Sequence, residues 1–388
     1  MSLINSRFVN ICLLMLVAIS AVALEGSFLQ IALHILLPIV FLVVFFFCIR
    51  DLLPNPSLKK YMYLLAWLCI ASLFAYNRDA ALQGMIKIAS GFFLSLSIYH
   101  LSQVEGNAKW LYLIMISSLA SMMYYASTNI GFVIAQEFQD RLGDEVLNAN
   151  MFAYFLFYSS FAIYFLLRPM FSKMKFLEIA IVLGLFVLSA WISLMTASRQ
   201  VLYLQIPFLV CLFLVGKLRL SFKNIFALLM IVLIVCFVAL PFFDTFYSGS
   251  LLADRSATSF QDDSRSTILM EAIKCGLSHP LFGVGPSNFV LVNRYHIFSH
   301  NCYAELFAGG GFVALVLYVT IIWINLKMQL ERYRITKDYF YMYHFIFQLF
   351  FAIDNMLYVQ INSLWLMGFY FVSVGHSDFY YKHKIALK

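Results

Sequence analysis

The sequence predicts an all-α polytopic membrane protein, and three observations support this fold class. Of the 388 residues, 63% are hydrophobic and only 12% are charged, which is far more apolar than the composition of soluble domains. The apolar residues collect in runs that approach the length of about 20 residues with which a helix crosses a bilayer. The 41 Phe and 23 Tyr residues fit helices that face lipid and end at its borders.

Twelve apolar segments are predicted to span the membrane. They lie at about residues 8–24, 28–48, 61–76, 80–99, 110–133, 149–167, 176–195, 200–216, 223–243, 302–325, 339–357 and 360–376. The first is interpreted as a span and not as a signal peptide, because no small-residue cleavage pattern follows it. The chain is therefore divided into residues 1–243 with nine spans, a large loop at 244–301, and residues 302–388 with three spans and a tail.

The distribution of Lys and Arg predicts the orientation. Most of these residues fall in connections on the same side as the N-terminus, and basic residues collect on the cytoplasmic side of membrane proteins. Both termini are therefore expected in the cytoplasm, and the loop at 244–301 is expected on the outer face with short helices of its own. The net charge of +7 reflects this topology and implies no nucleic-acid partner.

The cysteines predict no metal site, since no paired Cys and His spacing typical of zinc occurs among them. Of the seven Cys, only Cys275 and Cys302 lie outside the apolar runs, and the sequence leaves open whether they pair. No cofactor is predicted.

The large loop contains candidate ligand-binding residues. The stretch RSTILMEAIKCGLSHP (265–280) has apolar residues at helical spacing and ends at a proline, which predicts an amphipathic helix on the membrane surface. Its first residue, Arg265, can receive an anion together with backbone N–H groups. In HPLFGVGPSNF (279–289), Gly283 and Gly285 permit a tight path close to a ligand or a neighbouring helix, although an ordinary turn explains them as well. Arg255 is less constrained, and a solvated loop residue is the alternative.

Two basic residues lie where a membrane disfavours them. Arg199 is in a very short turn on the predicted outer face, so an acid, a lipid phosphate or an anionic substrate is expected to compensate it. Lys87, within the span at 80–99, is expected to help hold an anionic group. For both, the alternative is a side chain that snorkels to the interface.

A polar cluster begins the span at 302–325. In FSHNCYAELFAGGG (298–311), a neutral His300 can remove a proton from a hydroxyl near neutral pH, although most lone histidines are simply solvated. Asn301 is expected to orient His300 or to bind substrate. Glu305 is a secondary candidate, since a spacing of five residues does not place it on the same helical face as His300.

These residues carry a resemblance to a known family. HNCYAELFAGGG fits the pattern His-Asn, nine residues, Gly, which is similar to the motif of the O-antigen ligase and O-antigen polymerase superfamily of bacterial envelope glycosyltransferases. The second glycine of that motif is Ala314 here. TASRQVL resembles the family's Ser-Arg turn, the stretch at 264–289 resembles its Arg, helix, His-Pro and Gly-x-Gly region, and LNANMFA, with Asn150, resembles its Asn-rich span start. The resemblance covers roughly residues 145–325.

The resemblance implies a GT-C-like helical architecture and a metal-independent, inverting transfer at the outer face of the bacterial inner membrane. Arg199 and Arg265 would bind the diphosphate of an undecaprenyl-diphosphate-linked oligosaccharide donor, and His300 would activate the hydroxyl of the glycan acceptor. The candidate substrate-binding residues are Asn301, Arg255, Glu305, Gly283, Gly285, Asn150 and Lys87. Besides donor, acceptor and membrane lipids, a chain-length regulator protein is a candidate partner.

Three functions stay open at the level of sequence. The HPLFGVGPSNF stretch and the compact size favour a polymerase of O-antigen or capsular repeats, while an O-antigen ligase that transfers the glycan to lipid A-core needs the same donor chemistry. A polytopic transporter or flippase is the alternative from another class. Carriers place ionisable residues near the midplane in matched halves, whereas Lys87, His34, His344 and Asp354 are scattered through the spans.

Overall fold

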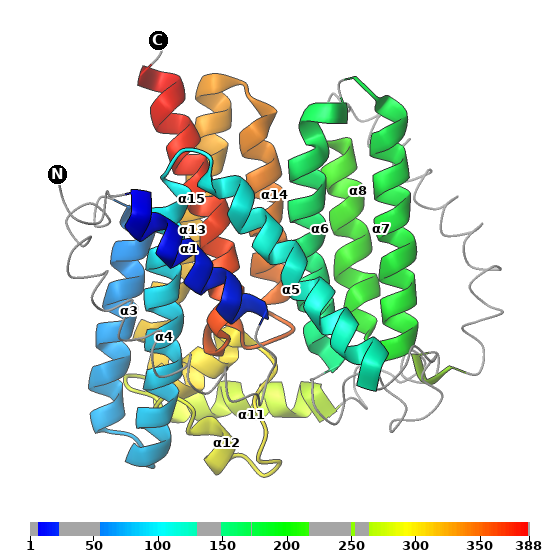
Figure 1. The fold of residues 1–388 in the computed structure, drawn as a ribbon. Helices are drawn as coiled ribbons and strands as arrows, with labels where there is room; N and C mark the ends of the chain where they lie inside the picture. The colour runs from blue at the N-terminus through cyan, green and yellow to red at the C-terminus, as the bar shows by residue number, and fades with distance from the viewer. Residues whose placement is uncertain are drawn as a thin grey trace. The chain divides into compact units, whose positions relative to one another are not determined.

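The computed structural model describes residues 7–22, 55–129, 149–171, 173–216, 250–252 and 264–386. The described residues form helices and connecting loops with no strand among them, which confirms the predicted helical class (Figure 1). The chain divides into two compact units. Unit 1 comprises Met1–Met115 and Phe260–Lys388, and unit 2 comprises Ile116–Ser259.

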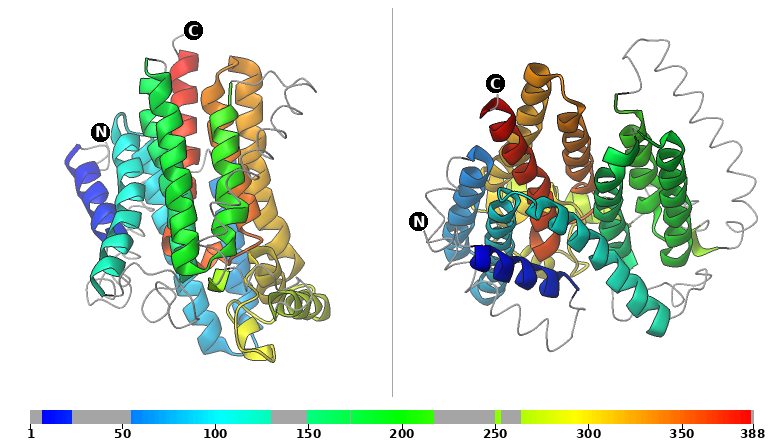
Figure 2. Two further views of the ribbon diagram at one scale, coloured as in Figure 1. Left: turned by 90° about the vertical axis from the view of Figure 1, so that its right-hand side faces the viewer. Right: turned by 45° about the horizontal axis from the view of Figure 1, so that its top comes forward.

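Unit 1 contains the long helices at both ends of the chain. Its helices are α1 (Arg7–Val22), α3 (Pro56–Leu73), α4 (Arg78–Ser102), the start of α5 (Asn107–Asn129), α11 (Ser264–Ser278), α12 (Phe289–Val292), α13 (Cys302–Thr336), α14 (Tyr339–Asp354), the short η4 (Gln360–Asn362) and α15 (Leu364–Ala386). Helix α13 packs against α3 and α14, and α15 packs against α4. Helix α11 packs on α13 and lies across one end of these long helices (Figures 1 and 2).

Unit 2 is built from the rest of α5, α6 (Ala149–Phe171), α7 (Lys175–Thr196), the π-helical turn η3 (Val201–Gln205) and α8 (Ile206–Leu214). Helices α6 and α7 pack together, and α8 runs back along α7 after a short turn. The predicted short connection near residue 199 is therefore present.

Short polar side chains define where several helices begin. Asn55, Asn77 and Asp338 immediately precede α3, α4 and α14, and each side chain accepts hydrogen bonds from backbone N–H groups of the first turn. Such caps satisfy N–H groups that have no partner within the helix and contribute about 1 kcal/mol each. Pro56 at the first position of α3 adds to this signal, because proline has no N–H to satisfy there.

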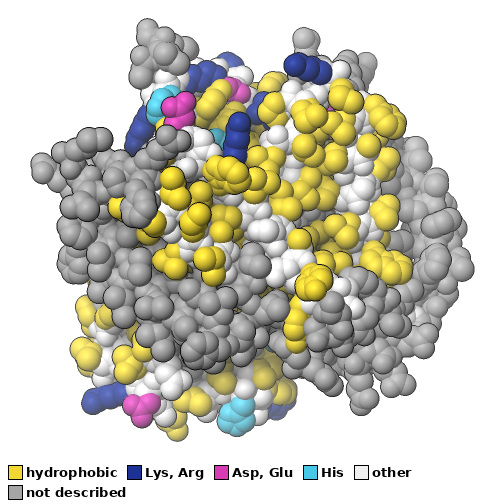
Figure 3. Space-filling view, viewed as in Figure 1, with side chains coloured by type: hydrophobic (Ala, Val, Ile, Leu, Met, Phe, Trp, Pro, Cys, Tyr) yellow, Lys and Arg dark blue, Asp and Glu magenta, His cyan; other side chains and the backbone are white. Residues whose placement is uncertain are grey.

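Five helices within the described ranges are long and apolar enough to cross a membrane. They are Arg78–Ser102, Asn107–Ser127, Asn150–Phe171, Phe176–Thr196 and Cys302–Thr336. The predicted spans at 28–48 and 223–243 lie outside the described residues, so the count of twelve stays a prediction. Figure 3 shows hydrophobic side chains along the helices and most of the charged side chains near the helix ends, which fits a membrane protein.

Helix α13 continues beyond the predicted span at 302–325 and ends at Thr336. The additional turns carry Lys327, Glu331 and Arg334, whose side chains are exposed. Hydropathy marks only the part of a helix that lies in hydrocarbon, and polar helix formers allow the helix to continue beyond it.

Helix α13 is broken at Gly311, where the backbone has φ 71° and ψ −171°. The loop that follows α11 supplies partners at the break: the Phe312 N–H donates to the Pro280 carbonyl oxygen at 2.8 Å, and the Val284 N–H donates to the Ala308 carbonyl oxygen at 2.8 Å. The indole N–H of Trp67 donates to the Gly310 carbonyl oxygen at 2.8 Å. Backbone groups near the break thus have hydrogen-bond partners. We call residues 279–288 and 308–312 together the loop–helix junction.

Glycines make this junction possible. A Cβ atom added to Gly311 would lie 2.1 Å from the carbonyl oxygen of Leu281, and one added to Gly283 would lie 2.4 Å from that of Ala308. Both glycines also have positive φ angles, of 71° and 64°, which other residues adopt at a cost. The sequence interpretation of Gly283 as a close approach to a neighbouring helix is therefore confirmed.

Replacement of Gly311 by Ala is expected to lower the free energy of unfolding by about 2–4 kcal/mol, because it combines backbone strain with a clash in a packed region. Thermal unfolding of the detergent-solubilised protein measures the change. Gly184→Ala in α7 is the matched control, since an added Cβ there has no atom within 4 Å. Equal midpoints for the two variants would contradict the proposed strain.

Candidate functional site

The residues that the sequence predicts for the site lie in both units. Unit 1 holds His300, Asn301, Glu305, Arg265, Gly283, Gly285 and Lys87, whereas unit 2 holds Arg199 and Asn150. Arg255 lies outside the described residues.

His300 directly precedes the Asn301 cap of α13 and is half-buried. Its φ angle of 53° is in the left-handed region, which costs a non-glycine residue roughly 1–3 kcal/mol. Hydrogen bonds fix the backbone on both sides. The Ser299 N–H donates to Oε2 of Glu305 at 2.9 Å, and the Cys302 N–H donates to the Asn355 carbonyl oxygen at 2.7 Å.

Both the oxygen and the nitrogen of the Asn301 side-chain amide form hydrogen bonds with the backbone. Its Oδ1 accepts from the Ala304 N–H at 3.0 Å as the cap of α13, and its Nδ2 donates to the Met356 carbonyl oxygen at 3.2 Å. This arrangement supports the orienting role that the sequence suggests, because it fixes the residue next to His300. Substrate binding by Asn301 stays a prediction.

Glu305 is buried beneath the same turn, with 6% of its surface exposed. One carboxylate oxygen accepts the Ser299 N–H, and the other, Oε1, has no hydrogen-bond partner among the described residues. A buried acceptor without a partner costs about 1–3 kcal/mol, so this oxygen is a candidate to meet a substrate hydroxyl. Glu305 thus supports the His300 turn through the backbone of Ser299.

Arg265 lies in the first turn of α11 and is half-buried. The apolar face of α11 buries Ile268 and Ala272 against Ala304 and Ala308 of α13. A helix with one buried apolar face is therefore present at the predicted place, and its position on the membrane surface stays a prediction. Ala304 lies four residues after His300. Helix α11, which carries Arg265, therefore packs against the part of α13 that follows His300.

The remaining candidates of unit 1 are Gly283 and Gly285, which belong to the loop–helix junction, and Lys87 on α4. Gly285 contacts Ala75, where an added Cβ would lie 2.3 Å from the Ala75 Cβ, so packing accounts for both glycines of the Gly-x-Gly motif. Lys87 is exposed on α4, one turn beyond Gly84, which packs against Ser287. No ion pair joins Lys87 to an acid in the described part of the chain.

In unit 2, the structure places Asn150 in contact with Ser198, the residue before Arg199. Helix α7 ends at Thr196, and Ala197 has a left-handed φ of 47°. The hydroxyl of Ser198, the neighbour of Arg199, donates to Oδ1 of Asn150 at 3.2 Å. Arg199 itself is half-buried, and the π-helical turn η3 follows it; such turns are frequent at functional sites.

Unit 2 also contains a buried polar contact that was not predicted from the sequence. Gln205 is 1% exposed, its Nε2 donates to Oγ of Ser160 at 2.6 Å, and its Oε1 has no hydrogen-bond partner in the described residues. The glutamine in the apolar run LYLQIPFLV was the available signal, because a buried amide in a membrane requires a partner.

Cys275 and Cys302 are both free thiols, so no disulfide joins them. Burial, followed by the nearby charge of Glu305, raises the pKa of Cys275 to about 11, which keeps this thiol protonated near neutral pH. Among the described residues, no group of three or more His, Cys, Asp or Glu side chains is placed to hold a metal ion.

Residues 184–319 match a protein family described as O-antigen ligase. The resemblance to the O-antigen ligase and polymerase superfamily is thereby confirmed. Arg199, Arg265 and His300 all lie within the matched residues, as do the loop–helix junction and α11. This superfamily comprises glycosyltransferase-like enzymes that act on lipid-linked glycans, so the comparison favours enzyme over transporter. A comparison with curated proteins gives no match.

Substitution of Glu305 by Ala is expected to reduce both stability and transfer activity, because the buried Ser299 N–H would lose its acceptor at a cost of about 1–3 kcal/mol. Glu305→Gln retains an acceptor oxygen of the same reach and should preserve most of both. Unfolding midpoints and transfer rates of the two variants measure this difference. Two variants with the same loss would show that the charge, and not the hydrogen bond, is required.

Proposed function

We propose that this protein is a polymerase of O-antigen or capsular polysaccharide that joins undecaprenyl-diphosphate-linked repeat units at the outer face of the inner membrane. The observation that carries the proposal is the convergence of α11 and α13. Arg265 lies on one of these packed helices, and His300, in a left-handed conformation, directly precedes the other. Both residues lie within the match to the O-antigen ligase family.

The proposed reaction needs a base and a group that stabilises a leaving diphosphate. His300 accepts the proton of an acceptor hydroxyl while the hydroxyl oxygen forms a bond to the anomeric carbon of the donor. The bond from that carbon to the diphosphate oxygen breaks on the opposite side, so configuration inverts and the electron pair leaves with undecaprenyl diphosphate. Arg265 offsets the charge that develops on this group, as a guanidinium fits phosphate through paired hydrogen bonds.

Arg199 is assigned the second position on the diphosphate. It belongs to unit 2, and its support in this role is the resemblance of its Ser-Arg turn to that of the family, within the matched residues. Lys87 is proposed as a further cation for the same lipid-linked group.

The choice of polymerase over ligase concerns the acceptor. Both activities use the same donor, and they differ in whether the hydroxyl comes from a second lipid-linked repeat or from lipid A-core. The outward orientation of the large loop and the cytoplasmic termini are part of the proposal, and they rest on the distribution of Lys and Arg in the sequence.

His300→Ala is expected to abolish glycan extension while the protein still inserts into the membrane, because the variant lacks the proposed base. Electrophoresis of surface glycolipids from a deletion strain complemented with this variant measures the effect. Lipid A-core bearing a single repeat indicates a polymerase, and bare core indicates a ligase. A normal ladder would remove the catalytic role of His300.

Arg265→Lys is expected to lower transfer activity by at least about tenfold, since an ammonium group cannot reproduce the paired hydrogen bonds of a guanidinium to diphosphate. Arg334→Lys is the matched control, because Arg334 is exposed near the far end of α13. Rates with a lipid-linked donor compare the two variants. Equal rates would contradict diphosphate binding by Arg265.

A further inference from the structure

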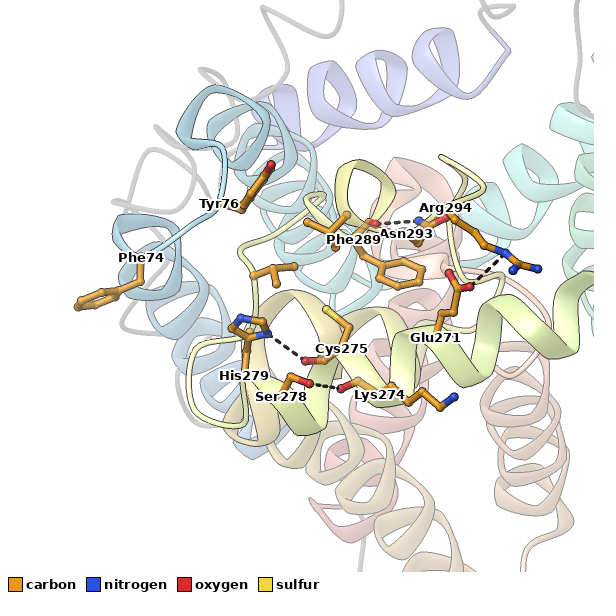
Figure 4. A pocket seen from close by; sticks show the side chains of 13 residues that line it. Phe74, Tyr76, Glu271, Lys274, Cys275, Ser278, His279, Phe289, Asn293 and Arg294 are labelled. Atoms are coloured by element: carbon orange, nitrogen blue, oxygen red, sulfur yellow. Dashed lines mark hydrogen bonds and ion pairs between the residues drawn. The ribbon is translucent and has the colours of Figure 1, made fainter.

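A cavity of about 750 Å³ lies at the C-terminal end of α11, apart from the residues assigned to the reaction. Its walls come from α11, the loop after it, α12 and the connection between α3 and α4 (Figure 4). All of these segments belong to unit 1. The volume is typical of pockets that bind compact organic ligands.

Charged side chains form one wall of this cavity. Glu271 on α11 and Arg294 after α12 form an ion pair of 3.5 Å, drawn in Figure 4. The Arg294 guanidinium also lies over the ring of Tyr295, 4.6 Å from its centroid. The side chain of Arg294 is 69% exposed, so the pair contributes little to stability, yet it holds donors and acceptors side by side at an open cavity.

Two further polar residues, Lys274 and His279, also line this cavity. Nδ1 of His279 lies 3.3 Å from the carbonyl oxygen of Cys275, which leaves Nε2 as an acceptor in the neutral ring. The ammonium of Lys274 is exposed and has no ion-pair partner in the described residues. Figure 4 shows both residues on the α11 side of the cavity.

Aromatic side chains complete the lining. Tyr76 is 73% exposed at the cavity, whereas Phe289 is buried in its wall. An exposed ring presents an apolar face and a polar edge, which suits the C–H faces and hydroxyl groups of a sugar. Adjacent acidic, basic and imidazole groups match neighbouring hydroxyls as paired donors and acceptors. A site for a bare phosphate would not place the Glu271 carboxylate in its wall.

We propose that this cavity is a saccharide-binding subsite, which holds sugar residues of the glycan away from the bond that is formed. Lys274 follows Arg265 by nine residues on α11, a rise of about 13 Å along a helix. One rigid helix therefore carries a diphosphate contact near its start and a sugar contact near its end. This subsite rests on the proposed function, and it selects the glycan by its non-reacting sugars.

The test is binding of the repeat-unit oligosaccharide, prepared from the host's own polysaccharide without lipid or diphosphate, to the full-length protein in detergent. Saturation-transfer NMR and calorimetry measure the dissociation constant. Glu271→Ala is expected to raise this constant at least tenfold, and Glu271→Gln provides a second variant of nearly the same volume. Glu331→Ala is the matched control, since Glu331 forms an exposed ion pair with Lys327 elsewhere in the same unit.

The two proposals have separate readouts, because glycan extension by His300→Ala tests the proposed function, whereas oligosaccharide binding by the Glu271 variants tests the subsite. Unchanged binding by both Glu271 variants, or no binding by a protein that still extends glycans, would overturn the subsite. A normal glycan ladder from His300→Ala would overturn the proposed function, whereas the binding measurements would still decide whether the cavity holds a saccharide.

Discussion

The break of α13 at Gly311 is the constraint on which the rest of unit 1 depends. A helix in hydrocarbon cannot leave backbone groups unpaired, so an interruption requires donors and acceptors from elsewhere in the protein. The loop after α11 supplies them through Pro280 and Val284, and Trp67 supplies a third bond. This requirement fixes the loop to the helix, and with the loop it fixes α11 and the start of α13.

The two ends of α13 are held by different interactions. At the far end, Arg332 and Asp378 form a buried ion pair of 2.5 Å, and Asp378 also accepts hydrogen bonds from Asn55 and Tyr99. Loss of one member would leave a buried charge without a partner, which typically costs 3–5 kcal/mol. Near the other end, packing and backbone hydrogen bonds dominate. Hydrogen bonds of Ser299 and Cys302 hold the backbone on both sides of His300.

Helix α11 connects the proposed chemistry with the proposed recognition of sugars. Its apolar face is buried on α13, and its two ends carry Arg265 and the cavity at Lys274. A polymerase must hold a long, flexible substrate while it reacts at one bond, and ordering that substrate costs conformational entropy. Several contacts with the substrate along one helix offset this entropy cost.

The sequence by itself determined the helical class, a helix within residues 265–280 and the resemblance that the family match confirms. Hydropathy and helical spacing report burial along a single segment, so they predict such features directly. They also indicated His300 and Arg265 as candidates, because polar residues beside long apolar runs are unusual. Hydropathy did not predict the extension of α13 to Thr336, because polar helical turns outside the hydrocarbon give no hydropathy signal.

Only the tertiary structure decided what these residues contact. Gly283 approaches Ala308, Glu305 accepts a hydrogen bond from the Ser299 backbone, and Glu271 pairs with Arg294 beside a cavity. Each of these contacts joins segments through a loop of irregular backbone. The backbone of such a loop has no regular sequence period that could be recognised. Its conformation depends on hydrogen bonds with the backbone groups that are unpaired at the break in α13.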